Sequence, residues 1–334
     1  MTCKIVISII NYRTEELTLN CIRTVVDDIG DLDAHVVVVD NASGDGSAEA
    51  IAAWLAEQPA DIPVELVLSP TNTGFPGGHN QGMQAREAEY YLLLNSDAVL
   101  RPGFLQAIVA AADADPDIGL FAPRIETEEG EAQTSLFRFH SPFSELIRGA
   151  GSGPVTRLFK RHVVALGPPA AQEDIEWATF ACILLRGTMV QRVGLMDEGY
   201  FLYFDDCDYS LTARRAGWRI KYVPEAVAVH FRGGSGPVKT LAKARKRLPS
   251  YYYASRTRFH YKAGGFFGLL AANLLWSVGR IIANARRLVG KSVPAANTAE
   301  WRDIWINFLD PLGPRRAPTE DHRPAWRRRL SRRG

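Results

Sequence analysis

Asp97 follows directly on an apolar run and is the first side chain of the sequence whose position suggests chemistry. Residues 90–94 form the run, and the chain continues with Asn95, Ser96 and Asp97. Alternate residues of a strand point to the same face, so Asn95 and Asp97 are expected to lie together. A carboxylate beside an amide oxygen is a hard donor set, which suits Mg²⁺ or Mn²⁺ better than zinc. The alternative is a polar turn that binds no ligand.

A second group of acids, Asp205, Asp206 and Asp208, begins a helix predicted over residues 205–216. Aspartate often caps helices, but a cap does not require three acids. The aromatic run at 200–204 comes immediately before them. Aromatic side chains beside a carboxylate suit a sugar-binding pocket that contains a general base.

His230 ends a predicted strand and is followed by a Gly-rich segment that begins with Arg232. A neutral imidazole can be a metal ligand, and a basic Gly-rich loop can wrap a diphosphate. A single histidine is more often structural. His230 is therefore a candidate only together with Asp97 and the basic segment.

Alternating strands and helices are predicted to position these side chains. The first 125 residues contain four apolar runs, at 4–10, 35–40, 64–68 and 90–94, with helices expected at 15–29, 47–57 and 78–88. This alternation predicts an α/β fold with a Rossmann-like, mostly parallel sheet and helices on both faces. All four runs end in polar or Gly-rich loops, where such sheets bind ligands, although turn chemistry could account for each loop alone.

The rest of the chain has a different pattern. Residues 130–170 are rich in Gly, Pro and Arg and weakly periodic, which predicts a long excursion or a mobile segment over the site. A strand-like run covers 175–187. Two short strands are expected at 219–223 and 226–231. The apolar segment 264–279 is shorter than the ~20 residues that cross a bilayer. It predicts either an interfacial helix or a helix that covers a groove of the main domain.

Composition and charge limit the class of protein. The chain has 334 residues, 46% of them hydrophobic, a net charge of +2, and four cysteines without paired short spacing. These features predict a soluble, cytoplasmic protein with neither a zinc site nor disulfides. The apolar run at 5–10 is interpreted as a first strand rather than a signal peptide. Nine Lys or Arg and no acid occur from Arg232 to Lys262, and eight Arg occur from Arg315 to the end, so the second half should face an anionic phosphate or membrane surface.

Several motifs together resemble glycosyltransferase family 2, the inverting enzymes of GT-A fold, and in particular its non-processive rhamnosyltransferase-like branch. In chain order they are "SIINYR", "VVVVDNASGDGS", "NTGFPGGHNQG", "LLLNSD", "VGLMDEGYFLYFDDCDYSLTARRAGW" and "VAVHFRGGS". The resemblance covers about residues 4–260. It implies a catalytic domain at 1–260, with a nucleotide-binding half at 1–125 and an acceptor-binding half at 126–260, and a helical, basic extension at 261–334.

The resemblance also implies roles for individual residues. Six of them would contact the nucleoside diphosphate of the donor: Asn11, Arg13, Asp40, Asn72, Gly74 and Asn80. Asp40 would accept a hydrogen bond from the base. Asp97 corresponds to the last acid of the family's D-x-D metal motif, with Asn95 where the first acid usually stands. His230 would be a further metal or diphosphate ligand, with Arg232 nearby. Asp206 would be the general base, preceded by Asp205.

The implied reaction is a metal-dependent single displacement with Mg²⁺ or Mn²⁺ as cofactor. A nucleoside diphosphate sugar, with rhamnose or another deoxyhexose as the expected sugar, would donate to a saccharide or a lipid-linked saccharide in polysaccharide biosynthesis. Galactose, galactofuranose, glucose and mannose stay open, since Phe180 stands where the family usually has a small residue. An anionic membrane surface at the inner face of the cell membrane is an expected partner, a homo-oligomer stays open, and no nucleic-acid partner is expected.

Two other functions compete with sugar transfer. A nucleotidyltransferase would need a basic phosphate-activating loop near the first strand, where the sequence supplies only Arg13. A non-catalytic carbohydrate-binding protein need not keep Asp97, Asp206 and His230 together. Neither alternative accounts for these side chains as well as sugar transfer does.

Overall fold

A mixed sheet of eight strands forms the base of the molecule in the computed structural model, which describes residues 3–167, 170–231 and 237–318. Its spatial order is β3-β2-β1-β4-β9-β6-β10-β5. The strands are β1 (Cys3–Asn11), β2 (Ala34–Asp40), β3 (Val64–Leu68), β4 (Ala88–Asn95), β5 (Ala98–Leu100), β6 (Ile118–Glu126), β9 (Cys182–Arg186) and β10 (Arg219–His230). A small second sheet pairs β7 (Leu136–Phe137) with β8 (Trp177–Ala178).

Helices cover both faces of the sheet, as predicted, because β1 sends apolar side chains to both sides. Ile5, Ile7 and Ile9 pack toward α1 (Glu15–Asp28), α2 (Ser47–Ala56) and α4 (Phe104–Ala114). Val6 belongs to the opposite core. That core also receives side chains from α3 (Gly74–Ala85), α7 (Gly187–Val193) and α8 (Asp205–Arg215).

The four strands predicted from apolar runs are parallel neighbours, and β6 and β10 run in the same direction. The mostly parallel sheet is thus confirmed, with β9 and β5 antiparallel. The strand-like run at 175–187 was wrong as a single element, because residues 179–181 separate β8 from β9. The two strands expected at 219–223 and 226–231 are one strand, β10, with an irregular register between Val223 and Val227.

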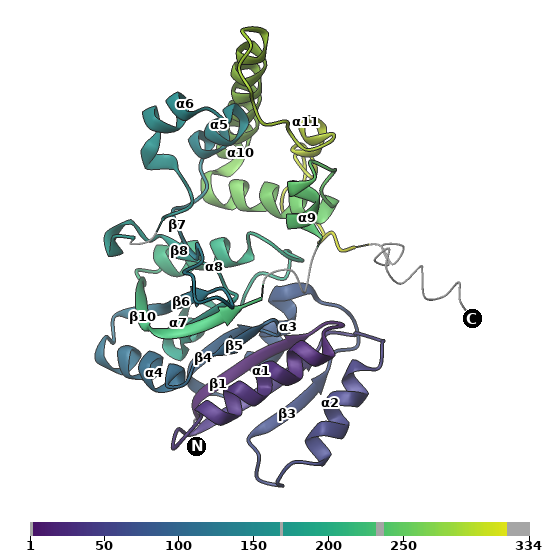
Figure 1. Cartoon of the computed structure of the whole chain (residues 1–334), viewed down its shortest axis with the longest axis vertical. Helices are drawn as coiled ribbons and strands as arrows, with labels where there is room; N and C mark the ends of the chain where they lie inside the picture. The colour runs from purple at the N-terminus through teal and green to yellow at the C-terminus, as the bar shows by residue number, and fades with distance from the viewer. Residues whose placement is uncertain (1–2, 168–169, 232–236, 319–334) are drawn as a thin grey trace, which may run out of the picture.

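A helical layer lies above the carboxyl end of the sheet (Figure 1). It consists of α5 (Pro142–Ala150), α6 (Gly153–Leu158), α9 (Val238–Lys243), α10 (Ser250–Leu288) and α11 (Glu300–Asp303). The predicted excursion at 130–170 contains α5, α6 and the short 3-10 turn η1 (Lys160–His162); a second such turn, η2 (Gln172–Asp174), follows. The apolar segment predicted at 264–279 is helical after its first two residues, because α10 consists of two helices joined at a kink at Gly264 and Gly265, and the segment begins the second of them.

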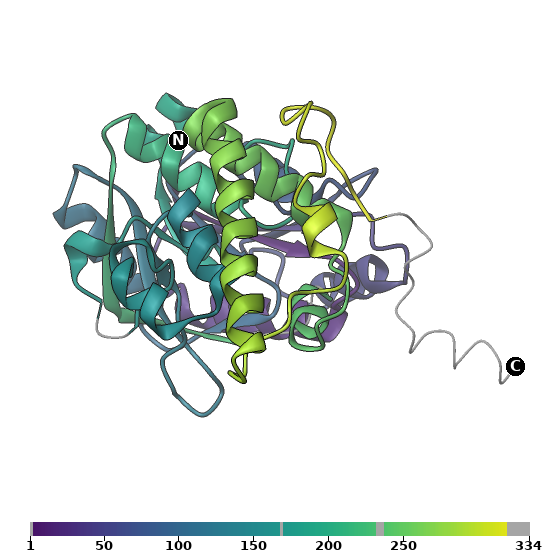
Figure 2. The same cartoon turned by 90° about the horizontal axis from the view of Figure 1, so that it is seen from above.

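The second half of α10 crosses the top of the molecule and packs on α5 (Figure 2). Glycines allow the two backbones to approach: a Cβ at Gly279 would lie 2.5 Å from the Leu146 carbonyl oxygen. By length and composition, α10 is the one helix of the described residues that could cross a membrane. However, 33% of its most apolar stretch is buried inside the protein. The packing on α5 agrees with the groove-covering alternative for this segment.

Candidate active site

A cleft opens where β4 and β10 end and α8 begins. Residues from several elements line it: Phe75, Asn95, Asp97, Thr179, Phe180, Ala181, Leu202, Tyr203, Asp205, Asp206, His230 and Lys239. Asp97, Asp206 and His230 are far apart in the sequence, and the fold brings all three to this cleft. Asp97 and two of the three acids of the second group are therefore on one surface.

Asp97 and His230 contact each other directly. After Asp97 the chain turns back as β5, which pairs antiparallel with β10 and aligns Ala98 with His230. The His230 Nε2 atom lies 3.1 Å from Asp97 Oδ1, and both side chains are nearly buried. The peptide N–H of Phe231 donates to the Asp97 carbonyl, which fixes the turn. Sheet pairing thus holds the carboxylate and the imidazole in place before any ligand arrives.

The donor set at this point fits a hard divalent cation. Asp97 offers carboxylate oxygen, His230 offers an imidazole nitrogen, and the amide side chain of half-buried Asn95 lines the same cleft. Oxygen donors with an imidazole suit Mn²⁺ or Mg²⁺ better than a thiolate-seeking ion. Within residues 3–167, 170–231 and 237–318, no three His, Cys, Asp or Glu side chains converge on one point. An ion would therefore need further ligands from a bound molecule or from water.

Asp205 and Asp206 are held at the cleft by a strained turn. Tyr203 and Phe204, directly before them, have φ values of 71° and 65°. Bulky residues rarely adopt this left-handed backbone, and such strain of roughly 1–3 kcal/mol per residue is concentrated at functional sites. Buried Tyr200, Phe259 and Cys207 pack with Phe204 and compensate for the strain. The turn starts α8 with its acids toward the cleft.

Burial changes the acidity of this pair. Desolvation raises the pKa of Asp206 to about 6, against the opposing effect of the backbone N–H groups of Cys207 and Phe180. Desolvation and the neighbouring Asp206 raise the pKa of Asp205 well above its ordinary value. Because the two carboxyl groups interact, their titration belongs to the pair. Burial thus favours the protonated form of both carboxyl groups, and the charge of Asp206 further disfavours ionisation of Asp205.

The third acid of the group does not line the cleft. Asp208 accepts from Lys262 Nζ, which also bonds Asp197. Asp197 further pairs with Arg258, and these cations lower its pKa to about 2 despite the opposing desolvation. These pairs join the start of α8 and the loop before it to α10. Asp208 is thus a structural residue.

The ends of β1 and β2 form a second polar group. The side-chain amide of buried Asn11 donates to Asp40 Oδ1 at 2.7 Å and to Ser47 Oγ at 2.8 Å. The other oxygen of Asp40 accepts from the Ser43 N–H. Arg13 lies at the exposed edge of the same loop, where its Nε donates to the Ser43 carbonyl oxygen. Asn11 thus orients Asp40, which is itself buried.

The loop before α3 contacts the turn that leads to the acids. The Asn72 side chain accepts from the Gly74 N–H and from Asn41. Gly74 has φ +74°, and a Cβ there would lie 2.2 Å from the Phe201 carbonyl oxygen. That same carbonyl accepts from the Phe75 N–H at 2.8 Å. Gly74 is thus needed for a close backbone approach between this loop and residue 201.

Asn80 lies away from the cleft. Its amide nitrogen donates to the Met196 carbonyl and to Glu198, and its oxygen accepts from the Met196 N–H. All of these partners belong to the loop between α7 and α8. The structure therefore gives Asn80 a bracing position, and Arg232, a further predicted ligand, lies outside the described residues.

Two family descriptions match this sequence. "Glycosyl transferase family group 2" matches residues 90–290, more than half of the chain, and "Glycosyl transferase family 2" matches residues 5–163. The chain belongs to glycosyltransferase family 2. The family resemblance found in the sequence is confirmed, and the protein is a glycosyltransferase that uses sugar nucleotide donors.

Known proteins are similar to this glycosyltransferase in sequence and in fold. An N-acetylglucosaminyl-diphospho-decaprenol L-rhamnosyltransferase from Mycobacterium tuberculosis is 27% identical over 234 residues, which are 63% of this chain and 72% of that protein. A mannosyltransferase from Pyrobaculum calidifontis, in complex with GDP-Man and Mn²⁺, has a TM-score of 0.55 at 17% identity, covering 93% of this chain and 85% of that one. GalNAc-T7 with UDP, GalNAc and Mn²⁺ has a TM-score of 0.57 at 12% identity, covering 94% and 60%. The GT-A fold is confirmed by these structures.

The glycosyltransferase cleft also contains residues that sequence reasoning did not select. Phe75 and Lys239 line it, whereas Leu202 and Tyr203, which also line it, belong to the run that the sequence pattern assigned to a sugar-binding pocket. Lys239 belongs to the basic stretch noticed in the sequence, but nothing in the pattern distinguished it from the other cations there. Phe180, noted as a departure from the family, lies in the cleft wall and is almost fully buried.

Proposed function

We propose that this glycosyltransferase transfers rhamnose or another deoxyhexose from a nucleoside diphosphate sugar to a lipid-linked saccharide, with inversion at the anomeric carbon. One observation carries the proposal: the Asp97–His230 pair and Asp206, whose pKa is near 6, line one cleft at the carboxyl end of the sheet. The pair suits a metal ion at a diphosphate, and the aspartate suits proton removal from a hydroxyl.

Asp97 and His230 would hold Mg²⁺ or Mn²⁺, with the Asn95 amide as an additional oxygen donor. A divalent ion at this point supplies charge neutralisation for a departing diphosphate. Mn²⁺ accompanies the nucleotide in both solved relatives named above. Because β5 and β10 fix the two side chains, the protein needs little rearrangement to bind the ion.

Asp206 would accept the proton of the acceptor hydroxyl as that oxygen attacks the anomeric carbon. A base with a pKa near 6 is largely ionised at neutral pH and still basic enough to assist attack. Desolvation and the charge of Asp206 favour the protonated form of Asp205 beside it, since two adjacent negative charges repel each other. One attack on the face opposite the leaving diphosphate inverts the configuration.

The loops after β1, β2 and β3 would bind the nucleotide. Asp40 would accept from the base, with Asn11 as its positioning residue and Arg13 at the exposed edge. Asn72 and Gly74 would shape the wall near the ribose and diphosphate. Asn80 would act indirectly, by fixing the loop that precedes the catalytic turn.

The choice of a deoxyhexose rests on one observation. The Mycobacterium tuberculosis relative, named as a rhamnosyltransferase, is 27% identical to this chain. Phe180 does not discriminate between donor sugars, because its side chain is buried in the core behind the cleft.

The preference for a lipid-linked acceptor rests on α10. Five of its residues share one outer face and are exposed by 43–90%: Phe267, Leu274, Val278, Ile281 and Leu288. Spacings of three, four and seven residues place them in line, and we call them the apolar stripe of α10. Arg286 and Arg287 follow in its last turn, and exposed Trp301 lies on neighbouring α11. A helix with an apolar face and a basic end suits an anionic membrane interface.

We propose that residues 1–260 form the catalytic unit, with a nucleotide-binding half at 1–125 and an acceptor-binding half at 126–260. Residues 261–334 would attach it peripherally to the inner face of the membrane. The division at 260 falls inside α10, close to its bend at Gly264. A unit that ends at this bend would keep the first half of α10, which packs against α8.

A panel of nucleotide sugars tests the donor proposal. The purified full chain is mixed with each sugar with and without Mn²⁺, and thermal stabilisation and sugar transfer are measured in parallel. We expect a deoxyhexose nucleotide to stabilise the protein most, by several degrees, and only with the metal present. Stabilisation without metal, or by a hexose nucleotide above all others, would contradict the proposal.

A further inference from the structure

A second cavity adjoins the catalytic cleft in the helical layer. Its lining comes from α5, α9, α10 and the segment before α11: Arg148, Gly151, Val238, Ala242, Arg245, Leu248, Tyr252, Trp276, Arg280, Ala296, Asn297 and Glu300 among others. The wall between the two spaces is thin. Val238 lines this cavity while its neighbour Lys239 lines the cleft, and the rings of Tyr252 and cleft residue Tyr203 lie 5.6 Å apart.

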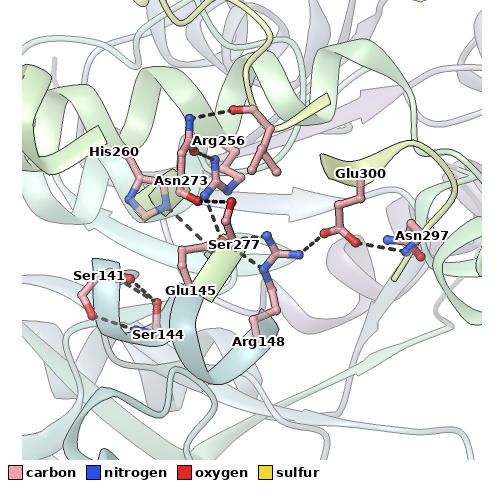
Figure 3. A network of polar contacts seen from close by, with 11 residues as sticks. Ser141, Ser144, Glu145, Arg148, Arg256, His260, Asn273, Ser277, Asn297 and Glu300 are labelled. Carbon is pink, nitrogen blue, oxygen red and sulfur yellow. Dashed lines mark hydrogen bonds and ion pairs between the residues drawn. The ribbon is translucent and has the colours of Figure 1, made fainter. Parts of the chain in front are cut away.

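Most charges beneath this cavity cancel one another (Figure 3). Buried Glu145 pairs with both Arg148 and Arg256, and Arg148 also pairs with buried Glu300. His260 lies beside Glu145, and burial lowers its pKa, so this imidazole is neutral. Two carboxylates thus balance two guanidinium groups. The network ties α5 to α10 and α11 and leaves no surplus charge of its own.

Arg245 and Arg280 add positive charge that this network does not balance. Arg280 uses one amino group to donate to the carbonyls of Gly149 and Pro294, which holds its guanidinium at the cavity wall. Desolvation lowers its pKa, and the nearby cations Arg287, Arg148 and Arg245 lower it further, whereas Glu300 raises it. Neighbouring positive charges therefore outnumber the acid that faces this side chain.

Arg245 is the more available of the two. Among the described residues, no hydrogen bond or ion pair involves its exposed side chain. Its backbone has φ 54°, a conformation that arginine seldom adopts. Its carbonyl accepts from both the N–H and the hydroxyl of Thr298, in the segment that forms the opposite wall. The fold therefore holds an unpaired guanidinium at the mouth of the cavity in a conformation that favours glycine or asparagine.

We propose that this cavity binds the diphosphate of the lipid-linked acceptor, so that its sugar reaches past Tyr203 to Asp206 while its chain follows the apolar stripe of α10. Arginine pairs are the side chains best suited to diphosphate, since each guanidinium donates two parallel hydrogen bonds. Trp276 and Arg280 face the cavity from α10, and Leu274, Val278 and Ile281 lie on the opposite face of the same helix, so the lipid chain would pass around α10 to reach the stripe.

The proposal rests on the proposed lipid-linked acceptor, but the site can be tested without any transfer reaction. Inorganic pyrophosphate is titrated into the full chain in EDTA, where a metal-dependent donor site is silent, and binding is measured by calorimetry. The variants are Arg245→Glu, Asp97→Ala and the control Arg192→Glu, an exposed arginine of α7. We expect Arg245→Glu to weaken binding by about tenfold or more, and the other two to bind as the parent does.

Pyrophosphate binding that Arg245→Glu leaves unchanged would overturn the proposal, as would binding that Asp97→Ala abolishes. A second arm separates an acceptor diphosphate from a membrane headgroup, using vesicles of phosphatidylglycerol in place of pyrophosphate. Vesicle binding that depends on Arg245 without any binding of pyrophosphate would also overturn it. If pyrophosphate binds as expected but no sugar is transferred, the proposed function fails while the anion site stands.

In a kinetic arm, the KM for an acceptor with a diphosphate is compared with the KM for a neutral alkyl glycoside of the same sugar. Arg245→Glu should raise the first by about tenfold and leave the second and the KM for the donor unchanged. An equal rise for both acceptors would mean that the substitution acts on folding or on the cleft, and would contradict a diphosphate site.

Discussion

Asp97 and His230 are 133 positions apart in the sequence, and their side chains lie 3.1 Å apart at the end of the sheet. The contact depends on β5, which folds back after Asp97 and pairs Ala98 with His230. Neither side chain would be a convincing metal ligand alone. The pairing of β5 with β10, which brings them together, is the structural basis of the proposed metal site.

Replacing Asp97 or His230 by alanine should weaken Mn²⁺-dependent nucleotide binding. Loss of an outer-shell partner of a metal ligand typically lowers metal affinity by about 10–100-fold, and loss of a ligand itself should cost at least as much. Calorimetry with a nucleoside diphosphate, with and without Mn²⁺, measures the effect. Asp27→Ala, at an exposed position on α1, is the control and should bind as the parent does. Equal nucleotide affinity in Asp97→Ala and the parent would refute the assignment.

The pH dependence of kcat/KM should report the ionisation of Asp206. Its raised pKa of about 6 means that the carboxylate form is lost as the pH falls through that value. The rate should therefore be level at neutral pH and fall about tenfold per unit below an apparent pKa near 6. An ascending limb centred near 4 would indicate a solvated carboxylate and contradict the burial argument.

The ionisation of Asp206 also affects the stability of the folded protein. The carboxylate form, which increases the rate, makes the fold less stable. The pKa of Asp206 is higher in the folded protein than the ordinary aspartate value of about 3.9, so folding favours the protonated form. Stability from this group is present below about pH 4 and declines as the pH rises through about 6. Asp206→Asn should consequently unfold at a higher temperature than the parent at pH 7.5, with little difference at pH 4.

Gly74→Ala should destabilise the protein through a steric clash as well as backbone strain. The new Cβ would lie 2.2 Å from the Phe201 carbonyl oxygen at a residue with φ +74°. Gly44→Ala is the matched control, because Gly44 has φ +58° but a Cβ added there would meet no atom within 4 Å. We expect a loss of about 1 kcal/mol at Gly44 and at least about 3 kcal/mol at Gly74, measured by urea unfolding. Equal losses would mean that the approach to Phe201 is unimportant.

Membrane attachment should depend on the apolar stripe of α10. The double variant Leu274→Glu, Ile281→Glu places charges on two side chains exposed by 50% and 67%, so folding should be little affected. We expect binding to phosphatidylglycerol vesicles to fall by about tenfold or more in a sedimentation assay. The control is Leu68→Glu on β3, where the leucine is 65% exposed. Unchanged binding of the double variant would rule out this face.

The parallel half of the sheet was predictable from sequence, because buried parallel strands need continuous runs of apolar residues such as those in β1, β2 and β4. The antiparallel strands could not be predicted from the sequence. β5 has only three residues, and β9 lies inside a longer apolar run that breaks at residues 179–181. Pattern and periodicity carry no information on the direction in which such short pieces pair.

Some residues of the candidate site could also be predicted from the sequence, and others could not. Asp97, Asp206 and His230 were found because charged side chains at the ends of buried strands or at a helix start need an explanation. The partners of Asn80 could not be foreseen, since Met196 is 116 positions away and meets it only in the folded chain. Lys239 could not be predicted for a different reason. It belongs to a run of cations, and the sequence does not show which of them lies at the cleft.

The most direct test of the mechanism compares sugar transfer by Asp206→Asn and Asp205→Asn under saturating donor and Mn²⁺. Asparagine mimics the protonated form that burial favours at Asp205, so this variant should keep activity within about fivefold of the parent. Asp206→Asn removes the base and should lower kcat by about 10²–10⁴-fold while donor affinity stays the same. Near-parent turnover by Asp206→Asn, or a larger loss in Asp205→Asn, would contradict the account.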